Sequence, residues 1–140
     1  MNYYTQMDEK KRYFLQPGYI FVTREPYIIQ TILGSCVCVC LWDKSASIGG
    51  MNHYIYAKPW DDRRTAEFGS VSTPYMISLM KKKGASLGNM KAHVAGGSQS
   101  RQMNANIRVG QQNVEMAFRI LKRYGIPVVE RDVQGTTGRK

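Results

Sequence analysis

The amino-acid sequence predicts an α/β domain in which helices cover the outer faces of a mixed or mostly antiparallel β-sheet. Short runs of β-branched and aromatic residues are separated by turn residues, as is typical of strands. Two further segments repeat apolar residues at helical spacing. No repeat or linker-like stretch divides the 140 residues, so we expect one domain at 17–140 after a flexible N-terminal lead-in at 1–16.

Six segments are predicted to be strands. The runs "GYIFVTR" (18–24) and "YIIQTIL" (27–33) flank Glu25 and Pro26, a pair that indicates a turn. The run "CVCVCLW" (36–42) is apolar throughout, so we expect a central strand that is covered on both faces. After the turn "DKSAS", segment 48–56 is predicted to return antiparallel to it. The runs "MKAHVAGG" (90–97) and "IPVVERDV" (126–133) complete the set.

Two helices are predicted from apolar stripes and from the residues at their ends. Ser72 or Thr73 can cap the first helix, and Pro74 suits its first turn. Lysines followed by Gly84 mark its C-terminal end. The second helix is predicted at 111–124, with Gly125 as its stop.

The chain is strongly basic, with a formal net charge of +10. Such a charge favours an acidic or polyanionic partner. The basic residues form only short clusters without a helix-turn-helix or ribonucleoprotein pattern, so a nucleic-acid-binding module is disfavoured. No apolar run reaches the roughly 20 residues of a membrane helix. The polar N-terminus lacks the apolar region of a secretory signal, so we expect a cytoplasmic protein without membrane insertion.

All cysteines of the chain lie in one short segment, at Cys36, Cys38 and Cys40. Residues two apart on a strand are about 6.5–7 Å apart, which fits a disulfide poorly, so we expect reduced thiols. Gly34 and Ser35 predict a tight turn before Cys36, where the backbone N–H groups of Ser35 and Cys36 can stabilise an oxyanion. A thiol beside such donors has two ingredients of acyl-transfer catalysis.

His53 is the candidate base for this thiol. If 36–42 and 48–56 form a hairpin, Cys36 and His53 lie close to opposite each other, and a thiolate–imidazolium pair would lower the pKa of the thiol. The hydroxyl of Thr31 can orient the histidine. The alternative is structural: a small buried cysteine, a hydrogen-bonded strand histidine and a β-branched strand residue. A zinc site is disfavoured, because Cys-x-Cys-x-Cys is not a usual zinc spacing.

Several stretches of the chain resemble one known family. The run "TILGSCVCVCLWD" followed by "GGMNH" is similar to the signature of the chemoreceptor glutamine deamidase family, CheD. The likeness continues in order through "KAHVAGGSQ", "NIRVGQQN" and "LKRYGIPVVERDVQGTTGRK", over about residues 17–140. One departure is Gln134, where the family more usually has glycine.

This resemblance implies a cysteine hydrolase that converts glutamine side chains of methyl-accepting chemotaxis receptors to glutamate and releases ammonia through a thioester. It also implies an α/β sandwich of packed sheets. Cys36 would be the nucleophile and His53 the general base, with Thr31, or Gln30 in a neighbouring register, as the third site residue. No metal or organic cofactor is implied.

The partners that the resemblance implies agree with the charge of the chain. The acidic helical bundle of such receptors would suit a net charge of +10. A non-catalytic adaptor, which binds a receptor or a CheC-like chemotaxis phosphatase, is the alternative function.

Overall fold

The computed structural model describes residues 11–99 and 108–140. Its middle layer is a five-stranded sheet in the order β2-β5-β4-β6-β7. The strands are β2 (Ile20–Thr23), β4 (Val37–Asp43), β5 (Ile48–Asn52), β6 (Met90–Gly96) and β7 (Val128–Val133). Only β6 and β7 pair in parallel; the other neighbours are antiparallel. The predicted mixed sheet is therefore confirmed.

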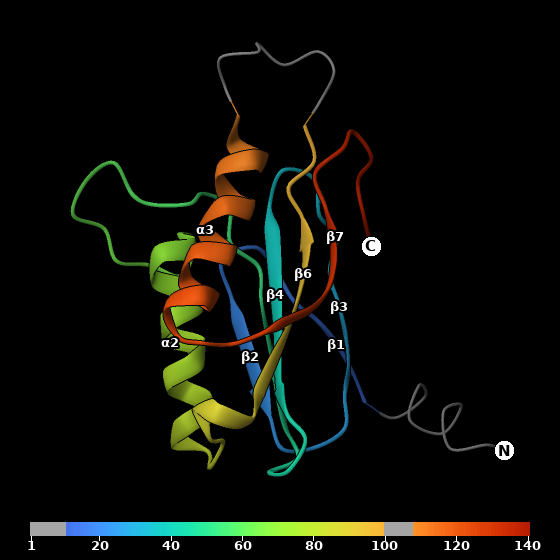
Figure 1. The fold of residues 1–140 in the computed structure, drawn as a ribbon. Coiled ribbons are helices and arrows are strands. Elements are labelled where there is room, and N and C mark those ends of the chain that lie inside the picture. The colour runs from blue at the N-terminus through green and yellow to red at the C-terminus, as the bar shows by residue number, and fades with distance from the viewer. Residues whose placement is uncertain (1–10, 100–107) are drawn as a thin grey trace, which may run out of the picture.

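The sheet is covered by a different layer on each face (Figure 1). Helices α2 (Gly69–Lys82) and α3 (Val109–Arg123) lie side by side on one face, and a short 3-10 helix, η1 (Leu87–Asn89), precedes β6. On the other face lies a parallel pair of short strands, β1 (Arg12–Phe14) and β3 (Ile28–Gln30). The predicted sandwich is confirmed, although both helices cover the same face.

Strand β4 is the centre of the molecule and contributes to both layers, as its continuous apolar run predicts. Val37, Val39 and Leu41 are at most 1% exposed and belong to the large core beneath the helices. The alternate residues point the other way, where Cys38 joins a smaller cluster with Leu15, Leu33 and Met51. The face of β4 that carries Val37, Val39 and Leu41 is called the helix face. The opposite face, which carries Cys38, is called the cysteine face.

The structure describes residues 11–16 of the predicted flexible lead-in, and these residues pack into the fold. Residues 1–10 lie outside the described part of the chain, but β1 pairs in register with β3, and Leu15 is completely buried. The backbone N–H of Leu15 donates to the carbonyl of Gln30 at 2.8 Å. Pairing with a distant strand anchors this segment, and such a pairing leaves no local sequence pattern.

Helix α2 begins earlier than predicted, so the expected cap at Ser72 or Thr73 is wrong. Phe68 is the N-cap, and its carbonyl accepts from the N–H of Ser72 at 2.8 Å. Gly69 opens the helix against the ring of Tyr54, where a Cβ would have no room. Pro74 lies inside the helix rather than in its first turn. Helix α3 begins and ends within two residues of its predicted limits.

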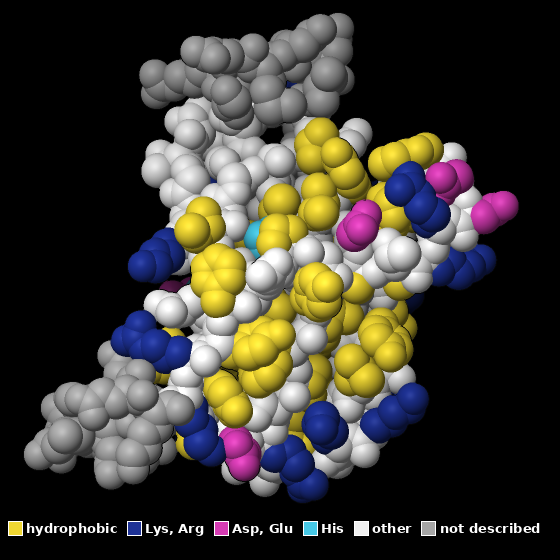
Figure 2. Space-filling model, turned by 180° about the vertical axis from the view of Figure 1, so that it is seen from behind, with side chains coloured by type: hydrophobic (Ala, Val, Ile, Leu, Met, Phe, Trp, Pro, Cys, Tyr) yellow, Lys and Arg dark blue, Asp and Glu magenta, His cyan; other side chains and the backbone are white. Residues whose placement is uncertain are grey.

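The side away from the helices carries a broad group of hydrophobic side chains bordered by Lys and Arg (Figure 2). Tyr13 and Phe14 of β1 and Ile32 after β3 are among the exposed apolar residues of the chain. In the described ranges, no helix is both long and apolar enough to cross a bilayer.

Candidate active site

The loop before β4 holds Cys36 at the N-terminal end of this central strand through its carbonyl groups. The carbonyl of Gly34 accepts from the N–H of Ser98 at 3.0 Å, and the carbonyl of Cys36 accepts from the N–H of Gly97 at 2.8 Å. Gly96 has a φ of +106°, and a Cβ on this residue would collide with the carbonyl oxygen of Cys36. A glycine at position 96 is therefore needed for the close approach of the two loops.

Two backbone N–H groups of the same loop can serve as donors. Within the part of the chain that the structure describes, neither the N–H of Ser35 nor that of Cys36 donates to a carbonyl oxygen. Cys36 itself is only partly buried. A partly exposed residue with a thiol beside two backbone donors that bind no carbonyl has the composition of an acyl-transfer site.

His53 is held by a chain of two hydrogen bonds from the small sheet. Its Nδ1 lies 2.7 Å from Oγ1 of Thr31, whose hydroxyl donates to the carbonyl of Leu15 at 2.8 Å. A hydroxyl has a single proton, so Thr31 must accept from Nδ1–H if it donates to Leu15. The neutral imidazole then carries its proton on Nδ1, and its Nε2 is a free base. This Nε2 is buried and has no hydrogen-bond partner among the described residues.

Parallel pairing of β1 and β3 explains why these groups meet. The register pairs Phe14 with Gln30, so the next residues, Leu15 and Thr31, lie side by side beneath the histidine. The side chain of Thr31, rather than that of Gln30, contacts His53. Leu15 was missed by sequence reasoning, because its role rests on a backbone carbonyl that any residue would supply.

The register of β4 and β5 corrects the predicted position of His53. Cys40 pairs with Met51, and Val37 forms a bridge with Tyr54, so His53 lies opposite Cys38 rather than Cys36. Cys36 and His53 are diagonal neighbours on the same face, a spacing of about 7–8 Å between Cα atoms. No hydrogen bond joins their side chains in the structure. Catalytic hydrogen bonds are often long before substrate binds.

The electrostatics of the site favour a neutral pair. Burial raises the pKa of the Cys36 thiol, and the thiol's own backbone N–H offsets only part of this effect. Burial also lowers the pKa of His53. The direction of the Cys36 shift is therefore opposite to the lowered thiol pKa that a thiolate–imidazolium pair would produce. Both shifts favour the thiol over the thiolate and the neutral imidazole over the imidazolium.

Asn113 of α3 is a further residue of the site that sequence reasoning missed. Its Nδ2 donates to the carbonyl of Ser35 at 2.9 Å and to the carbonyl of Ile55 at 2.8 Å. Its backbone carbonyl accepts from the hydroxyl of Tyr54. The helix therefore fixes the turn before Cys36. A signal existed, because Asn113 is a polar residue within the buried stripe of an otherwise amphipathic helix.

The two other cysteines lie deeper on the cysteine face. Cys38 and Cys40 have their sulfur atoms 3.8 Å apart, and neither is in a disulfide. Both line a cavity of about 550 Å³ together with Thr31, Met51 and His93. Among the residues described, no three His, Cys, Asp or Glu side chains are arranged to hold a metal ion.

Comparison with known proteins gives consistent matches. A family model described as CheD chemotactic sensory transduction matches residues 56–140. A protein of Anaeromyxobacter dehalogenans, named probable chemoreceptor glutamine deamidase CheD 1, is 40% identical over 128 residues, or 91% of this chain and 75% of that protein. A probable chemoreceptor glutamine deamidase CheD of Sulfurimonas denitrificans is 36% identical over 138 residues, or 96% of this chain and 87% of that protein.

A solved structure supports the fold alone. The hypothetical protein YfiH of Bacillus licheniformis matches with a TM-score of 0.53 at 13% sequence identity. The match covers 84% of this chain and 50% of that chain, so this chain spans half the length of that protein.

Proposed function

Because the chain belongs to the CheD chemotactic sensory transduction family, we propose that it is a hydrolase that deamidates glutamine side chains of chemoreceptors. The observation that carries the proposal is the fixed imidazole of His53. Its Nδ1 is hydrogen-bonded to Thr31, and its Nε2 has no hydrogen-bond partner among the described residues. His53 lies on the same face of the sheet as Cys36. A general base needs a ring nitrogen that is free to take a proton, and Nε2 is such a nitrogen.

In the first half of the reaction, the thiol of Cys36 attacks the carbon of the glutamine carboxamide. Nε2 of His53 takes the thiol proton, and Thr31 accepts from Nδ1–H and so stabilises the imidazolium. The carbonyl oxygen of the substrate becomes an oxyanion, and the free N–H groups of Ser35 and Cys36 donate to it. The C–N bond breaks when the imidazolium gives its proton to the nitrogen, so that ammonia leaves and a thioester remains.

In the second half, water replaces ammonia. Nε2 of His53 takes a proton from the water as its oxygen attacks the thioester carbon. The bond from carbon to sulfur breaks, the sulfur of Cys36 recovers a proton from the imidazolium, and glutamate leaves. The cycle restores the thiol and the neutral imidazole. His53 carries the protons of the thiol, the departing ammonia and the attacking water, and the carboxylic acid that forms loses its remaining proton to solvent to become glutamate. This chemistry calls for no cofactor.

The first test is ammonia release and mass spectrometry of a chemoreceptor cytoplasmic fragment treated with the protein. We expect conversion of glutamine to glutamate, which Cys36→Ala abolishes and His53→Gln slows by roughly 10²–10⁴-fold. Both variants should keep the wild-type circular dichroism spectrum.

Two outcomes would count against this proposal. Equal activity of the wild type and the Cys36→Ala variant would remove the nucleophile from the site. A folded wild type that binds several receptor fragments and converts none would favour the adaptor function instead.

A further inference from the structure

Residues 134–140, here called the C-terminal strap, turn back after β7 towards the loop that carries Cys36 (Figure 1). The strap begins with two successive left-handed residues, Gln134 at a φ of +64° and Gly135 at a φ of +75°. A residue other than glycine keeps such a conformation only where its surroundings impose it. The reversal of the chain therefore points to contacts that hold the strap in place, although the strap supplies none of the reacting groups.

The strap is paired with the residue three positions before Cys36. Leu33 and Arg139 form an antiparallel bridge, in which the backbone N–H of each residue donates to the carbonyl of the other at 2.8 Å. The two segments also lie close together, since a Cβ on Gly138 would be 3.3 Å from the carbonyl oxygen of Leu33. The bridge thus fixes the first residue of the nucleophile loop, which we define as residues 33–36.

The strap also holds the turn at 96–99, which binds the nucleophile loop in its turn. The N–H of Gln134 donates to the carbonyl of Gly96 at 2.9 Å, and the N–H of Gln99 donates to the carbonyl of Gly135 at 2.8 Å. The same turn supplies the two N–H groups that bind carbonyls of the nucleophile loop. The strap therefore reaches this loop by two routes, one direct and one through the turn.

The side chain of Arg139 folds the strap onto the end of β7. Its Nη2 donates to Oδ1 of Asp132 at 3.3 Å, and its Nη1 donates to the carbonyl of Thr137 at 3.0 Å. The side chain of Asp132 is 67% exposed. Because an ion pair that is open to water contributes little, we assign the hold on the loop to the backbone bridge with Leu33 rather than to this pair.

Hydrogen bonds to the carbonyls of the loop determine where its N–H groups point. A peptide group is planar, so binding of the Gly34 carbonyl fixes the direction of the Ser35 N–H, which belongs to the same peptide group. This carbonyl accepts from the N–H of Ser98, in the turn that the strap holds. The carbonyl of Ser35 shares a peptide group with the N–H of Cys36 and accepts from Asn113. The strap therefore acts mainly on the donor at Ser35.

The position of this donor matters for the rate of acyl transfer. A donor stabilises an oxyanion only when it lies within about 2.7–3.1 Å of the developing charge. A misplacement of about 1 Å can cost about a hundredfold in rate. A segment that fixes the loop can therefore change the rate without contacting the reacting atoms.

We propose that the C-terminal strap is a positioning element of the reaction, which holds the nucleophile loop where the N–H of Ser35 can stabilise the oxyanion. The backbone bridge between Arg139 and Leu33 is its main contact. This proposal rests on the proposed function, because acyl transfer is the reaction that develops an oxyanion beside Cys36. Arg139 is a positioning residue, since it acts through the loop.

The test removes one backbone hydrogen bond from the strap. Arg139→Pro deletes the N–H that donates to Leu33, whereas Arg139→Ala loses the same side chain and keeps this N–H. With a receptor cytoplasmic fragment as substrate, we expect Arg139→Pro to lower kcat about tenfold to a hundredfold and to leave KM within about threefold.

Two controls should keep kcat within about threefold of the wild type, because neither loses a backbone hydrogen bond. The first is Arg139→Ala. The second is Lys140→Pro, since the N–H of Lys140 donates to no carbonyl in the described ranges. A loss of kcat in Arg139→Ala as large as that in Arg139→Pro would remove the role of the backbone bridge and overturn the proposal.

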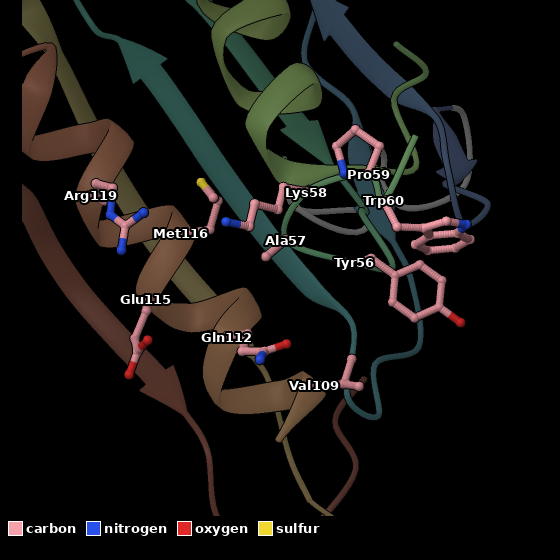
Figure 3. A pocket seen from close by; sticks show the side chains of 10 residues that line it. All are labelled: Tyr56, Ala57, Lys58, Pro59, Trp60, Val109, Gln112, Glu115, Met116 and Arg119. Atoms are coloured by element: carbon pink, nitrogen blue, oxygen red, sulfur yellow. The ribbon is translucent and has the colours of Figure 1, made fainter. Parts of the chain in front are cut away.

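A destabilised variant shows whether stability alone accounts for the effect. Met116 is buried in the large core and lines a groove of about 530 Å³ between α3 and the loop after β5, on the helix side of the sheet (Figure 3). Met116→Ala should unfold at lower urea concentration, with kcat within about twofold at a temperature where it is folded. Equal losses of kcat in Met116→Ala and Arg139→Pro would overturn the proposal.

A chemical probe separates the strap from the proposed function. When p-nitrophenyl acetate acetylates Cys36, sulfur bonds to the acetyl carbon through an oxyanion, p-nitrophenolate leaves, and the thiol proton passes to His53. Iodoacetamide instead loses iodide to the sulfur and forms no oxyanion. Mass spectrometry of Cys36 measures both rates. We expect Arg139→Pro to slow acetylation about tenfold and not to slow alkylation.

This result would support the strap even if no receptor fragment were deamidated, which would refute only the proposed function. Equal slowing of both reagents, or no slowing of acetylation, would refute the strap and leave the deamidase standing. Failure of p-nitrophenyl acetate to acetylate Cys36 of the wild type would also overturn the proposal, because the loop would then stabilise no oxyanion.

Discussion

The two faces of strand β4 are built from alternate residues of one apolar run and serve different purposes. Towards the helices, Val37, Val39 and Leu41 enter a core of eighteen buried residues. Towards the small sheet, Cys38 belongs to a buried cluster of only four, beside a cavity of about 550 Å³. The helix face is closely packed, whereas the cysteine face leaves room for chemistry.

The two faces of β4 also differ in the buried polar side chains that lie near them. The candidate site brings Thr31 and His53 to the cysteine side, where they are 6% and 2% exposed. Burying a histidine costs free energy unless its nitrogens are bonded, and one nitrogen of His53 has no partner among the described residues. The molecule therefore gives up some stability on the cysteine face, which is a common property of functional sites. Substitutions on the two faces should separate stability from activity.

The largest change in stability is expected from a substitution on the helix face. Leu41→Ala should lower the free energy of unfolding by about 2–5 kcal/mol, because it leaves a cavity in a dense core. The kcat should change little at a temperature where the variant is folded. The measurement is urea unfolding with a parallel deamidation assay. Cys40→Ala, on the partly buried opposite side, is the control and should cost less stability. Equal losses for both variants would mean that the two faces are equally packed.

An intermediate effect, on kcat, is expected at Thr31, where the small sheet contacts His53. Thr31→Val keeps the shape of the side chain but leaves Nδ1–H of His53 and the carbonyl of Leu15 without a partner. Losing a buried hydrogen bond of this kind costs about 1–3 kcal/mol, so we expect kcat to fall on the order of tenfold to a hundredfold. Thr31→Ser retains the hydroxyl and should restore most of the rate. Failure of serine to rescue would point to packing rather than orientation.

The smallest effect concerns the pH dependence of stability. Burial lowers the pKa of His53 in the folded protein, so below the ordinary value of about 6.5 the unfolded chain binds a proton that the folded chain does not. This contribution to stability is complete above about pH 6.5 and is lost as the pH falls further, with a slope of at most about 1.4 kcal/mol per pH unit.

His53→Gln should remove this slope in urea unfolding curves recorded between pH 5 and 7, conditions chosen around the ordinary value of about 6.5. His93→Gln, at the other histidine of the chain, serves as the control and should retain it. An unchanged slope in His53→Gln would show that the histidine is not held in its neutral form.

The sequence predicted much of the architecture, because its strands and helices carry strong local patterns. The apolar run at 36–42 became a central strand, and the segments after it became its antiparallel partner and two amphipathic helices. The predicted start of α2 was wrong, because contacts between Tyr54, Phe68 and Gly69 outweigh the capping preference of the local sequence. The departure at Gln134 has a structural counterpart, since this residue adopts a φ of +64°, a conformation that glycine adopts without strain.

The sequence by itself determined the family, the mixed sheet and the identity of the chemical groups, since these depend on residue type and spacing within short segments. Only the tertiary structure decided how the groups meet. The pairing of β1 with β3 brings Leu15 and Thr31 to His53, and α3 brings Asn113 to the turn before Cys36. These contacts join residues that are 16 to 78 positions apart. They arise from strand register and burial, which depend on the whole chain rather than on any one segment.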